Sequence, residues 1–440
     1  MRKAATQIVL ELRAAGHEAC FAGGCVRDLL RGAEPKDYDI ATSARPDEVL
    51  KLYPKADSVG AHFGVILVRR GGHHFEIATF REDGEYRDGR RPESVTFTTA
   101  EDDARRRDFT INGMFYDPAE ERVIDHVGGR ADLEAGKIRA IGDPRERFRE
   151  DYLRLLRAIR FATVLGFEIE ADTWEAIRDV AGRIVKISPE RIRDELDKIW
   201  RSPNRLKGFD LLVGSGLMEA ILPEILALRG CEQPPQFHPE GDVFVHTRLM
   251  LSLLPADADL PLVLSVLLHD IAKPDTFSLD PAEGRIRFNG HEKVGAEKAA
   301  VILKRLRYPN ATIDAVVSGV AHHMQFKDVQ KMRTATLKRF MARERFDEEL
   351  ELHRVDCLGS NGRLENHAYL VEKREQFANA PLPTSWFLSG ADLIAQGISP
   401  GPALGRVLTE AHDLQLDGTL TSREEALEWL ARQNDEGTAS

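Results

Sequence analysis

The period of hydrophobic and polar positions changes near residue 141. Before that point, short apolar runs alternate with helical patterns. The patterns predict helices over 2–15, 24–31 and 46–53, and strands over 17–22, 37–41, 94–98, 114–117 and 122–126. Two further apolar runs, 64–70 and 73–80, are separated by Gly71-Gly72 and predict a β-hairpin. The first 140 residues are therefore expected to form a small mixed sheet with flanking helices.

Beyond residue 141 the strand patterns almost disappear. Asp143-Pro144 predicts a helix with Pro at its first position, and helical periodicity continues over 151–165, 172–183, 189–201 and 204–215. A chain of 440 residues is too long for one compact core. The predicted class is α+β, with a mixed-sheet head (1–140), an all-α neck (141–230), a further helical domain (231–375) and a helical tail (376–440).

Composition narrows the functional class only slightly. Hydrophobic residues make up 42% and charged residues 30%, as in an ordinary globular protein. No apolar run has the length of a membrane span, so no membrane partner is expected, and the N-terminal pattern is that of an amphipathic helix. The four cysteines form no C-x-x-C pair, which predicts reduced thiols in a cytoplasmic protein.

The net charge of −11 argues against nucleic-acid binding by the surface as a whole. A local exception lies between Arg139 and Arg160, where seven arginines accompany four acids. Such a basic stripe can hold phosphates on an acidic protein, although a solvated helix face explains any one of these arginines equally well.

The strongest chemical pattern is Gly23-Gly24-Cys25-Val26-Arg27-Asp28 followed by Asp37-Tyr38-Asp39. The glycine pair stands between a predicted strand and a predicted helix, where backbone N–H groups favour phosphate. We expect Asp37 and Asp39 to share one face of a strand, and two adjacent carboxylates suit Mg²⁺ ions. A phosphate site beside a two-metal site is what nucleotidyl transfer requires.

These residues resemble the class II tRNA nucleotidyltransferase and bacterial poly(A) polymerase family, within the DNA polymerase beta-like superfamily. Four more motifs follow in the family's order and extend the resemblance over about the first 200 residues. They are Arg107-Asp108-Phe109-Thr110-Ile111-Asn112, Asp125-His126-Val127-Gly128-Gly129, Arg147-Phe148 with Glu150-Asp151 and Arg154, and Glu190-Arg191-Ile192-Arg193 with Glu195-Leu196.

The resemblance implies roles for the head residues. Asp37 and Asp39 would bind the metal, and Glu76 fits either a third carboxylate ligand or an exposed strand acid. Gly24 and Arg27 would hold the triphosphate, the arginine through a bidentate fork. The remaining ribose and triphosphate contacts would be Arg107, Asp108 and Asn112.

In this family the pair equivalent to Asp151 and Arg154 reads the incoming base without a template. Three residues apart, the two are expected to share a helix face. Cytosine and adenine both present an amino donor beside a ring-nitrogen acceptor, which a carboxylate and a guanidinium can match. Uracil and guanine would leave buried polar groups unpaired, at a cost of about 1–3 kcal/mol each. Arg157 would complete the base contact, whereas a simple helix ion pair is the alternative for Asp151 and Arg154.

Activities within the family differ, and the sequence favours one of them. Poly(A) polymerases of the family tend to carry a basic Gly-Arg-Arg-Phe or Gly-Lys-Arg-Phe stretch, where this chain has Gly60-Ala61-His62-Phe63-Gly64. This departure favours CCA addition to tRNA from CTP and ATP over poly(A) synthesis. Enzymes that add only CC or only A remain alternatives. The segment 387–394 resembles the family's C-terminal segment that contacts the tRNA body.

A second constellation begins with His269-Asp270 at the end of the apolar run 262–268. An adjacent His-Asp pair at a buried helix end is costly without a metal, and mixed His and Asp ligands suit a divalent ion, whose identity stays open. The order resembles that of HD-domain phosphohydrolases. We expect His246, His269, Asp270 and Asp356 to hold one metal, and His291, His322 and His323 to bind a second metal or a phosphate. Lys273 would contact the scissile phosphate, and His238 is expected to lie outside the set.

The predicted function is therefore Mg²⁺-dependent addition of CCA to tRNA, with an additional HD phosphohydrolase activity. The neck and tail would recognise the acceptor end of tRNA by shape and phosphate contacts. Two rivals from other classes remain: an HD hydrolase whose head only binds nucleotides, and a non-catalytic RNA-binding protein.

Overall fold

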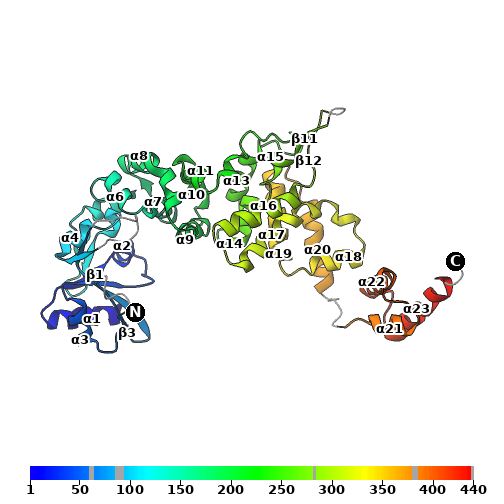
Figure 1. Cartoon of the computed structure of the whole chain (residues 1–440), viewed down its shortest axis with the longest axis horizontal. Helices are drawn as coiled ribbons and strands as arrows, with labels where there is room; N and C mark the ends of the chain where they lie inside the picture. Colours follow the sequence, from blue (N-terminus) through cyan, green and yellow to red (C-terminus); the bar gives the residue numbers. More distant parts are fainter. Residues whose placement is uncertain (59–63, 85–93, 281–283, 379–384, 438–440) are drawn as a thin grey trace. The chain divides into compact units, whose positions relative to one another are not determined.

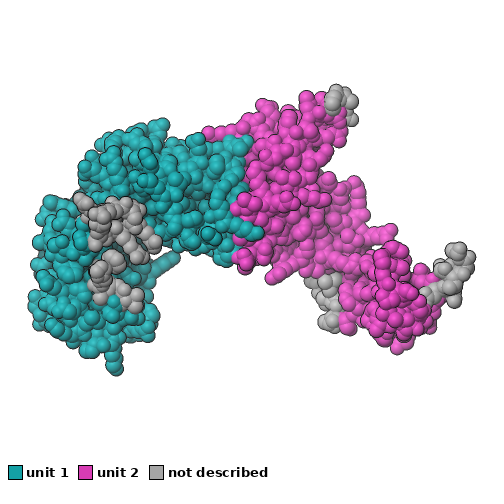
Figure 2. Space-filling model, viewed as in Figure 1, with its two compact units in different colours: residues 1–227, 255–263, 302–309 teal, residues 228–254, 264–301, 310–440 magenta. Residues whose placement is uncertain are grey.

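The computed structural model describes residues 1–58, 64–84, 94–280, 284–378 and 385–437. The segment 60–63, on which the preference for CCA over poly(A) synthesis rested, lies outside the described residues. Two compact units divide the chain (Figure 2). Unit 1 comprises residues 1–227, 255–263 and 302–309, and unit 2 comprises residues 228–254, 264–301 and 310–440. The predicted division into four domains stays a prediction.

Among the described residues, six strands form one mixed sheet in the order β3-β4-β2-β1-β7-β8. Figure 1 labels β1 and β3 of this sheet. They are β1 Ala19–Ala22, β2 Asp39–Thr42, β3 Val65–Arg70, β4 His73–Thr79, β7 Phe115–Asp117 and β8 Arg122–Ile124. Strands β2 and β4 are parallel, and the other neighbours are antiparallel. All four residues of β1 are buried because the strand lies inside the sheet. The predicted α+β class with a mixed-sheet head is confirmed.

Short helices accompany this sheet. They are α1 Arg2–Ala14, α2 Gly24–Leu30, α3 Pro46–Leu52, α4 Ala100–Arg105, the 3₁₀ helix η2 Thr110–Asn112 and α5 Gly129–Glu134. Helix α1 buries Ala5, Ile8 and Leu12 on one face, which is the spacing of an amphipathic helix. The strand predicted over 94–98 exists as β6 Val95–Phe97, but it pairs with β5 Arg81–Asp83 in a separate two-stranded sheet.

Two glycines of the motifs are required by close approach. Gly23 precedes α2 with φ +74°, and a Cβ there would lie 3.0 Å from Arg107 Nη1. At Gly129 a Cβ would collide with the carbonyl oxygen of Thr110. Neither position accepts a side chain without moving its neighbours. Because Gly23 and Gly129 have no side chain, α2, η2 and α5 can pack closely, and polar residues on these elements can then form contacts.

The neck of unit 1 is helical, as predicted, but some of its helices begin or end at other residues than predicted. The elements are α6 Pro144–Glu150, α7 Leu153–Leu165, α8 Ala171–Val180, η3 Ala181–Lys186, α9 Pro189–Trp200, α10 Arg205–Gly214, α11 Leu217–Ile221 and α12 Pro223–Leu226. Asp151 caps the end of α6 with extended φ and ψ of −147° and 107°, so the predicted helix start at 151 is wrong. The sequence pattern also missed a short parallel pair, β9 Lys137–Ile138 with β10 Glu168–Ile169.

Unit 2 contains the histidine-rich region. Its helices are α13 Val243–Leu253, α15 Lys273–Thr276, α17 Asn310–His322, η4 His323–Lys331, α18 Thr334–Met341, α19 Phe346–Gly359 and α20 Glu365–Ala378. Helices α14 Leu260–Leu268 and α16 His291–Arg305 have residues in both units. A hairpin of β11 Phe277–Leu279 and β12 Ile286–Phe288 was not predicted.

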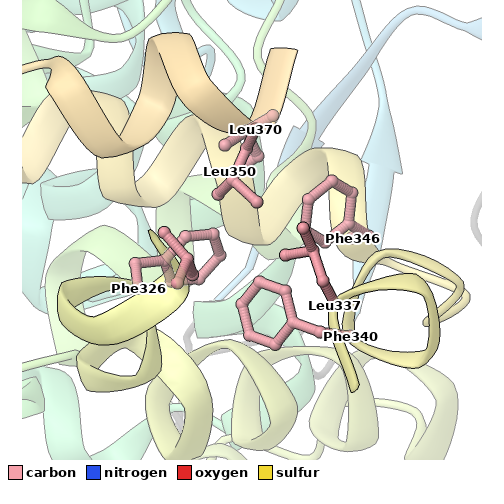
Figure 3. Close-up of a cluster of buried hydrophobic side chains, with 7 residues drawn as sticks. Phe326, Leu337, Phe340, Phe346, Leu350 and Leu370 are labelled. Atoms are coloured by element: carbon pink, nitrogen blue, oxygen red, sulfur yellow. The ribbon is translucent and has the colours of Figure 1, made fainter. Parts of the chain in front are cut away.

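A hydrophobic cluster fixes the second half of this region (Figure 3). Phe326 of η4 packs edge-on against Phe340 of α18, with ring centroids 5.0 Å apart. It also stacks on His353 of α19 at 4.7 Å. Leu350 and Leu370 close the cluster from α19 and α20. This core holds α19, which carries Asp356, against the segment that begins with His323.

The tail contains, within its described part, α21 Gly390–Ala395, α22 Pro402–Leu416 and α23 Arg423–Gly437. These helices have a small core of their own, made by Leu388, Leu393, Ala411, Leu420, Ala426 and Leu430. Of the helices in the described residues, none is both long and apolar enough to cross a bilayer.

Candidate active site and candidate metal centre

A cavity of about 500 Å³ lies in unit 1, between the first residues of α2, the loop before β2, η2 and the neck helices. It brings together ten of the residues predicted from the motifs, although they are scattered over more than 130 positions of the chain. These are Gly24, Arg27, Asp37, Asp39, Arg107, Asp108, Asn112, Asp151, Arg154 and Arg157. Glu76 is not among the residues that line it.

The two carboxylates at one end of the cavity differ in their surroundings. Asp39 is the first residue of β2, whereas Asp37 precedes the strand and is exposed, so the prediction that both lie on one strand face is wrong. Burial, together with the charges of Asp37 and Glu76, raises the pKa of Asp39 to about 6 against the opposing effect of Arg107. Negative charge thus accumulates at this point, and a hard divalent cation would relieve it.

Glu76 lies beside this point on the neighbouring strand. Ile77 of β4 is opposite Ile40 of the parallel strand β2, so Glu76 and Asp39 each stand one residue before this pair. The charge of Glu76 acts on Asp39, but its side chain is exposed. Its role as a third metal ligand stays a prediction.

A hydrogen-bonded chain links α2 to η2 along the cavity wall. Arg27 donates through Nη1 to Asn112 Oδ1 at 2.8 Å and through Nε to Asp28 Oδ1 at 2.9 Å. Asn112 Nδ2 donates in turn to Asp108 Oδ1 at 3.2 Å. Asp28 is therefore the partner of Arg27, and the guanidinium is held with its remaining donors available to an anion.

Asp108 joins the head to the neck. Arg157 of α7 donates to Asp108 Oδ2 through Nε at 2.7 Å. Burial opposes ionisation of the Asp108 carboxyl, but Arg157 and Asn112 outweigh it and lower the pKa of Asp108 to about 2. The same pairing raises the pKa of Arg157. Arg157 therefore has a structural partner as well as a place in the cavity.

Asp151 and Arg154 both line the cavity, but they do not share a helix face as predicted. Asp151 lies between α6 and α7, where Oδ2 accepts from Arg191 Nη2 at 2.8 Å and Oδ1 accepts from the Leu153 N–H at 2.9 Å. Arg154 donates to the Arg147 carbonyl at 2.8 Å and forms an ion pair with Glu150. The alternative of a simple ion pair between Asp151 and Arg154 is also wrong, because each has another partner.

Four further cationic or aromatic side chains line this cavity and were not predicted as site residues: Arg106, Arg160, Phe161 and Arg191. The guanidinium of Arg160 lies 3.8 Å from the centre of the Phe161 ring, and burial lowers its pKa to about 10. Arg160 also pairs with Glu195 at 2.7 Å. The three-residue spacing of Arg154, Arg157 and Arg160 along α7 was the available signal, since such residues lie close together on a helix.

Asp103 is a buried carboxylate that the sequence analysis missed. It accepts from Arg106 Nη2 at 2.7 Å and from Arg107 Nη2 at 2.9 Å, and so holds both arginines at the cavity. Burial opposes ionisation, but the two guanidiniums hold the pKa of Asp103 below its usual range. The i,i+4 spacing to Arg107 behind the Thr99 cap of α4 is visible in the sequence.

The second site lies in unit 2 and contains two groups of possible metal ligands. Within each group, the ligand atoms all lie within 4.8 Å of one another. One group is His246, His269 and Asp356, and the other is Asp270, His291 and His323. All six come from the predicted set. Their side chains are nearly all buried. A cavity of about 540 Å³ opens onto four of these ligands and is also lined by Lys273, Arg285 and Arg287.

Three of these histidines are fixed in the same tautomer. Nδ1 of His269, His291 and His323 donates to a backbone carbonyl three residues earlier, at 2.9, 2.7 and 2.7 Å. Since a neutral imidazole carries one proton, each Nε2 presents a lone pair. Nε2 of His291 lies 3.1 Å from Nε2 of His323, and Nε2 of His269 lies 3.0 Å from Asp270 Oδ2. Lone pairs that face each other or a carboxylate in a buried site are suited to a metal ion.

The structure changes the predicted set at three places. Asp270, which was predicted to share a metal with His246, His269 and Asp356, groups instead with His291 and His323. His322 points to Glu349, 3.1 Å from Oε1, and takes no part in the two groups. His238, which was expected to lie outside, shares Glu240 with His246 in a third group of ligand atoms. Neighbouring residues on a helix point in different directions. His323 therefore joins Asp270 and His291, while His322 faces Glu349. Lys273 lies within the site and pairs with Asp270 at 2.7 Å.

Comparison with known families divides the chain into three matched stretches. The poly A polymerase head domain matches residues 19–139, the probable RNA and SrmB-binding site of polymerase A matches residues 166–228, and the HD domain matches residues 243–358. The first match contains the head residues that line the unit 1 cavity, from Gly23 to Asn112, and the third contains the six ligands of the unit 2 site.

Individual relatives agree with these matches. The chain is 45% identical over 211 residues to the CCA-adding enzyme of Geobacillus thermodenitrificans, covering 48% of this chain and 52% of that protein. For the CCA-adding enzyme of Lactobacillus johnsonii the identity is 42% over 238 residues, covering 54% and 58%. The chain thus spans a little over half the length of the curated relatives it matches.

Solved structures extend the likeness over the whole fold. A crystal structure of the Bacillus stearothermophilus CCA-adding enzyme in complex with CTP has a TM-score of 0.76 at 27% identity and covers 99% of this chain and 98% of that one. The Thermotoga maritima CCA-adding enzyme complexed with tRNA has a TM-score of 0.63 at 20% identity, covering 98% and 94%, which shows a common fold.

The buried position of Asp103 gives a testable prediction. In Asp103→Asn the amide cannot neutralise Arg106 and Arg107, so we expect unit 1 to lose about 1–3 kcal/mol of stability. Glu101→Gln is the control, because the Glu101–Arg105 pair has the same i,i+4 spacing on the exposed face of α4 and should change stability by less than about 0.5 kcal/mol. Hydrogen exchange of unit 1 peptides during a urea titration measures both.

The same titration at lower pH tests the cause. Because folding lowers the pKa of Asp103 from 3.8, its contribution is present above pH 3.8 and is lost as the pH falls further. The difference between the wild type and Asp103→Asn should therefore shrink in acid. Equal stability losses for the two variants at neutral pH would contradict the assigned role.

Proposed function

We propose that this chain, which belongs to the class II tRNA nucleotidyltransferase and bacterial poly(A) polymerase family and carries an HD domain, adds C, C and A to the 3′ end of tRNA from CTP and ATP. The observation that carries the proposal is the cavity of unit 1. It places two adjacent carboxylates, an arginine-rich wall and the pair Asp151 and Arg154 around one space.

In the proposed reaction, the terminal hydroxyl of tRNA attacks the α-phosphate of the nucleotide. The new phosphodiester bond forms as the bond to pyrophosphate breaks, and the hydroxyl proton is released. Mg²⁺ held by Asp37 and Asp39, with Glu76 as a candidate third ligand, would supply charge stabilisation to the attacking and leaving oxygens. Asp39 is suited to this role because burial and neighbouring acids raise its pKa to about 6.

The arginine wall would bind the triphosphate. Arg27 is held by Asp28 and Asn112, and Arg107 by Asp103, so both enter the reaction already oriented. A guanidinium has five N–H donors, and the contacts with these residues use only part of them. Preorganised donors of this kind stabilise charge without having to rearrange during the reaction.

Base selection would depend on Asp151 and Arg154. Arg191 and the Leu153 N–H hold the Asp151 carboxylate, while Glu150 and the Arg147 carbonyl hold Arg154. Fixed in this way, an acceptor and a donor can face the amino group and the ring nitrogen that cytosine and adenine share. A CTP complex is known for the structural relative at 27% identity, and we extend CTP and ATP binding to this chain on the strength of this geometry.

Related activities of the same family remain alternatives to the full CCA reaction. Addition of CC alone, of A alone, or of a poly(A) tail would use the same carboxylates and arginines. We also propose tRNA as the RNA partner, because residues 166–228 match an RNA-binding stretch and a relative has been solved with tRNA. The four unpaired cysteines agree with a cytoplasmic location.

We further propose a metal-dependent phosphohydrolase activity for the HD domain. His246, His269 and Asp356 would hold one divalent ion, and Asp270, His291 and His323 would hold a second, because their lone pairs converge within 4.8 Å. The ions would activate water and polarise a phosphate ester. Lys273, buried beside Asp270, would contact the phosphate. His322 is not included, since it points to Glu349.

Primer extension tests the main proposal. tRNA transcripts that lack the last three, two or one nucleotides are incubated with each nucleoside triphosphate singly and together, and the products are separated on a sequencing gel. We expect CTP to extend the first by two residues and ATP to complete the last by one. Asp37→Ala with Asp39→Ala should lower extension about a hundredfold or more. A long A tail would indicate a poly(A) polymerase, and intact activity of the double variant would favour the HD hydrolase.

Base choice gives a separate prediction. In Arg154→Ala, the preference for CTP and ATP over UTP and GTP should fall by about tenfold or more, because a donor to the base is lost, while turnover persists with all four. Arg149→Ala serves as the control, since Arg149 is exposed on α6 and is not among the residues lining the cavity. An unchanged preference in Arg154→Ala would remove this residue from base reading.

The two activities should be separable. Asp270→Ala removes a buried carboxylate of unit 2 and should abolish hydrolysis of 2′,3′-cyclic nucleotides or terminal phosphates with Mn²⁺, Co²⁺ or Ni²⁺. Nucleotide addition, which depends on unit 1, should stay within about twofold of the wild type. His367→Ala, a histidine outside both groups, is the matched control. Loss of both activities in Asp270→Ala would contradict independent sites.

A further inference from the structure

The segment 231–242, which precedes α13, contributes buried side chains to the HD site. Gln233 is buried and accepts a hydrogen bond from Lys273 Nζ at 2.6 Å. Glu240 accepts from His246 Nδ1 at 2.7 Å, and the Glu240 side chain is only 8% exposed. Buried polar groups at both ends of the segment therefore contact residues of the proposed metal centre.

The contacts of His246 determine which of its nitrogens carries the proton. Besides Glu240, Nδ1 lies 3.2 Å from the carbonyl oxygen of Gly359. A carbonyl can only accept, so Nδ1 is the protonated nitrogen. Nε2 then presents its lone pair 3.1 Å from Asp356 Oδ1, and it has no hydrogen bond within the described part of the chain. This is the tautomer that a metal ligand requires.

The carboxylate of Glu240 lies between two imidazoles. His238 Nδ1 is 2.9 Å from the same Oε1 that His246 contacts, and the two rings meet edge to face with centroids 5.0 Å apart. The second oxygen, Oε2, is buried without a hydrogen bond among the described residues. A buried carboxylate in this position is costly unless it supports positive charge nearby.

We propose that Glu240 is a positioning residue of the HD metal centre, an inference that rests on the proposed HD metal site. Glu240 holds His246 with Nδ1 protonated and Nε2 directed at the metal, and it increases the basicity of the ring. His269, His291 and His323 obtain the same tautomer from backbone carbonyls. His246 differs because its principal partner is a carboxylate from a segment outside the helices. Such partners typically change metal affinity 10–100-fold.

The alternative for Glu240 is direct ligation, because His238, Glu240 and His246 also form a group within 4.8 Å. Two imidazole N–H groups already occupy Oε1, and His246 can offer only one lone pair, which points to Asp356. The geometry therefore favours positioning over ligation, and the number of bound ions separates the two.

The experiment uses the full chain with Asp37→Ala and Asp39→Ala, so that metal binding by the head does not interfere. Co²⁺ alone is titrated, and binding is followed by calorimetry and by visible absorption. We expect Glu240→Ala to bind Co²⁺ 10–100-fold more weakly with the number of bound ions unchanged and the absorption bands shifted. Glu240→Gln should recover most of the affinity, because its amide oxygen can accept from Nδ1. Glu232→Ala, exposed on the same segment, is the control.

Each outcome is decisive. Metal-free melting temperatures show whether Glu240→Ala is folded, and Glu240→Gln provides the comparison if it is not. Equal Co²⁺ affinity in Glu240→Ala, Glu240→Gln and Glu232→Ala overturns the inference. Loss of one bound ion in Glu240→Ala, with the affinity for the rest unchanged, overturns positioning in favour of ligation. Absence of Co²⁺ binding in the chain with Glu240 intact overturns the metal centre itself, and with it the HD part of the proposed function.

Discussion

Repulsion between guanidinium groups is the constraint on which the site in unit 1 depends. Seven arginines line one cavity, and each has an acidic partner. The pairs are Arg27–Asp28, Arg106–Asp103, Arg107–Asp103, Arg154–Glu150, Arg157–Asp108, Arg160–Glu195 and Arg191–Asp151. Pairing lets the cations approach one another and fixes their directions. A guanidinium has five N–H donors, so a paired arginine can still donate to the phosphates of the proposed nucleotide substrate.

Several of these pairs connect segments that are far apart in the chain. Arg157 meets Asp108 across 49 residues, and Arg191 meets Asp151 across 40. The pair Arg157–Asp108 therefore also holds α7 of the neck against the head, whereas Arg191–Asp151 joins two parts of the neck. This explains how a protein with a net charge of −11 can gather seven arginines around one cavity: the acids beside them offset their charge and fix their directions.

The site in unit 2 has the opposite chemistry: it gathers groups that bind cations, whereas the cavity of unit 1 gathers arginines. Imidazole lone pairs and carboxylates converge in a buried space, and their mutual repulsion calls for a cation. Backbone carbonyls fix three imidazoles, and Glu240 fixes a fourth. The hydrophobic cluster around Phe326 keeps α19 and η4 in place behind these ligands. In both units, then, the charged groups that face the cavity depend on a second layer of partners.

The sequence by itself determined the mixed-sheet head, the helical body and most members of both sites, because strand and helix periods and motif spacing are local properties. It did not determine the break at Asp151, the departure of His322 from the metal groups, or the parts played by Asp103 and Glu240. Each of these depends on a partner that folding supplies from another segment, as when Arg191 draws Asp151 away from Arg154. Only the tertiary structure decides such pairings, because spacing along the chain carries no information about which distant charges will meet.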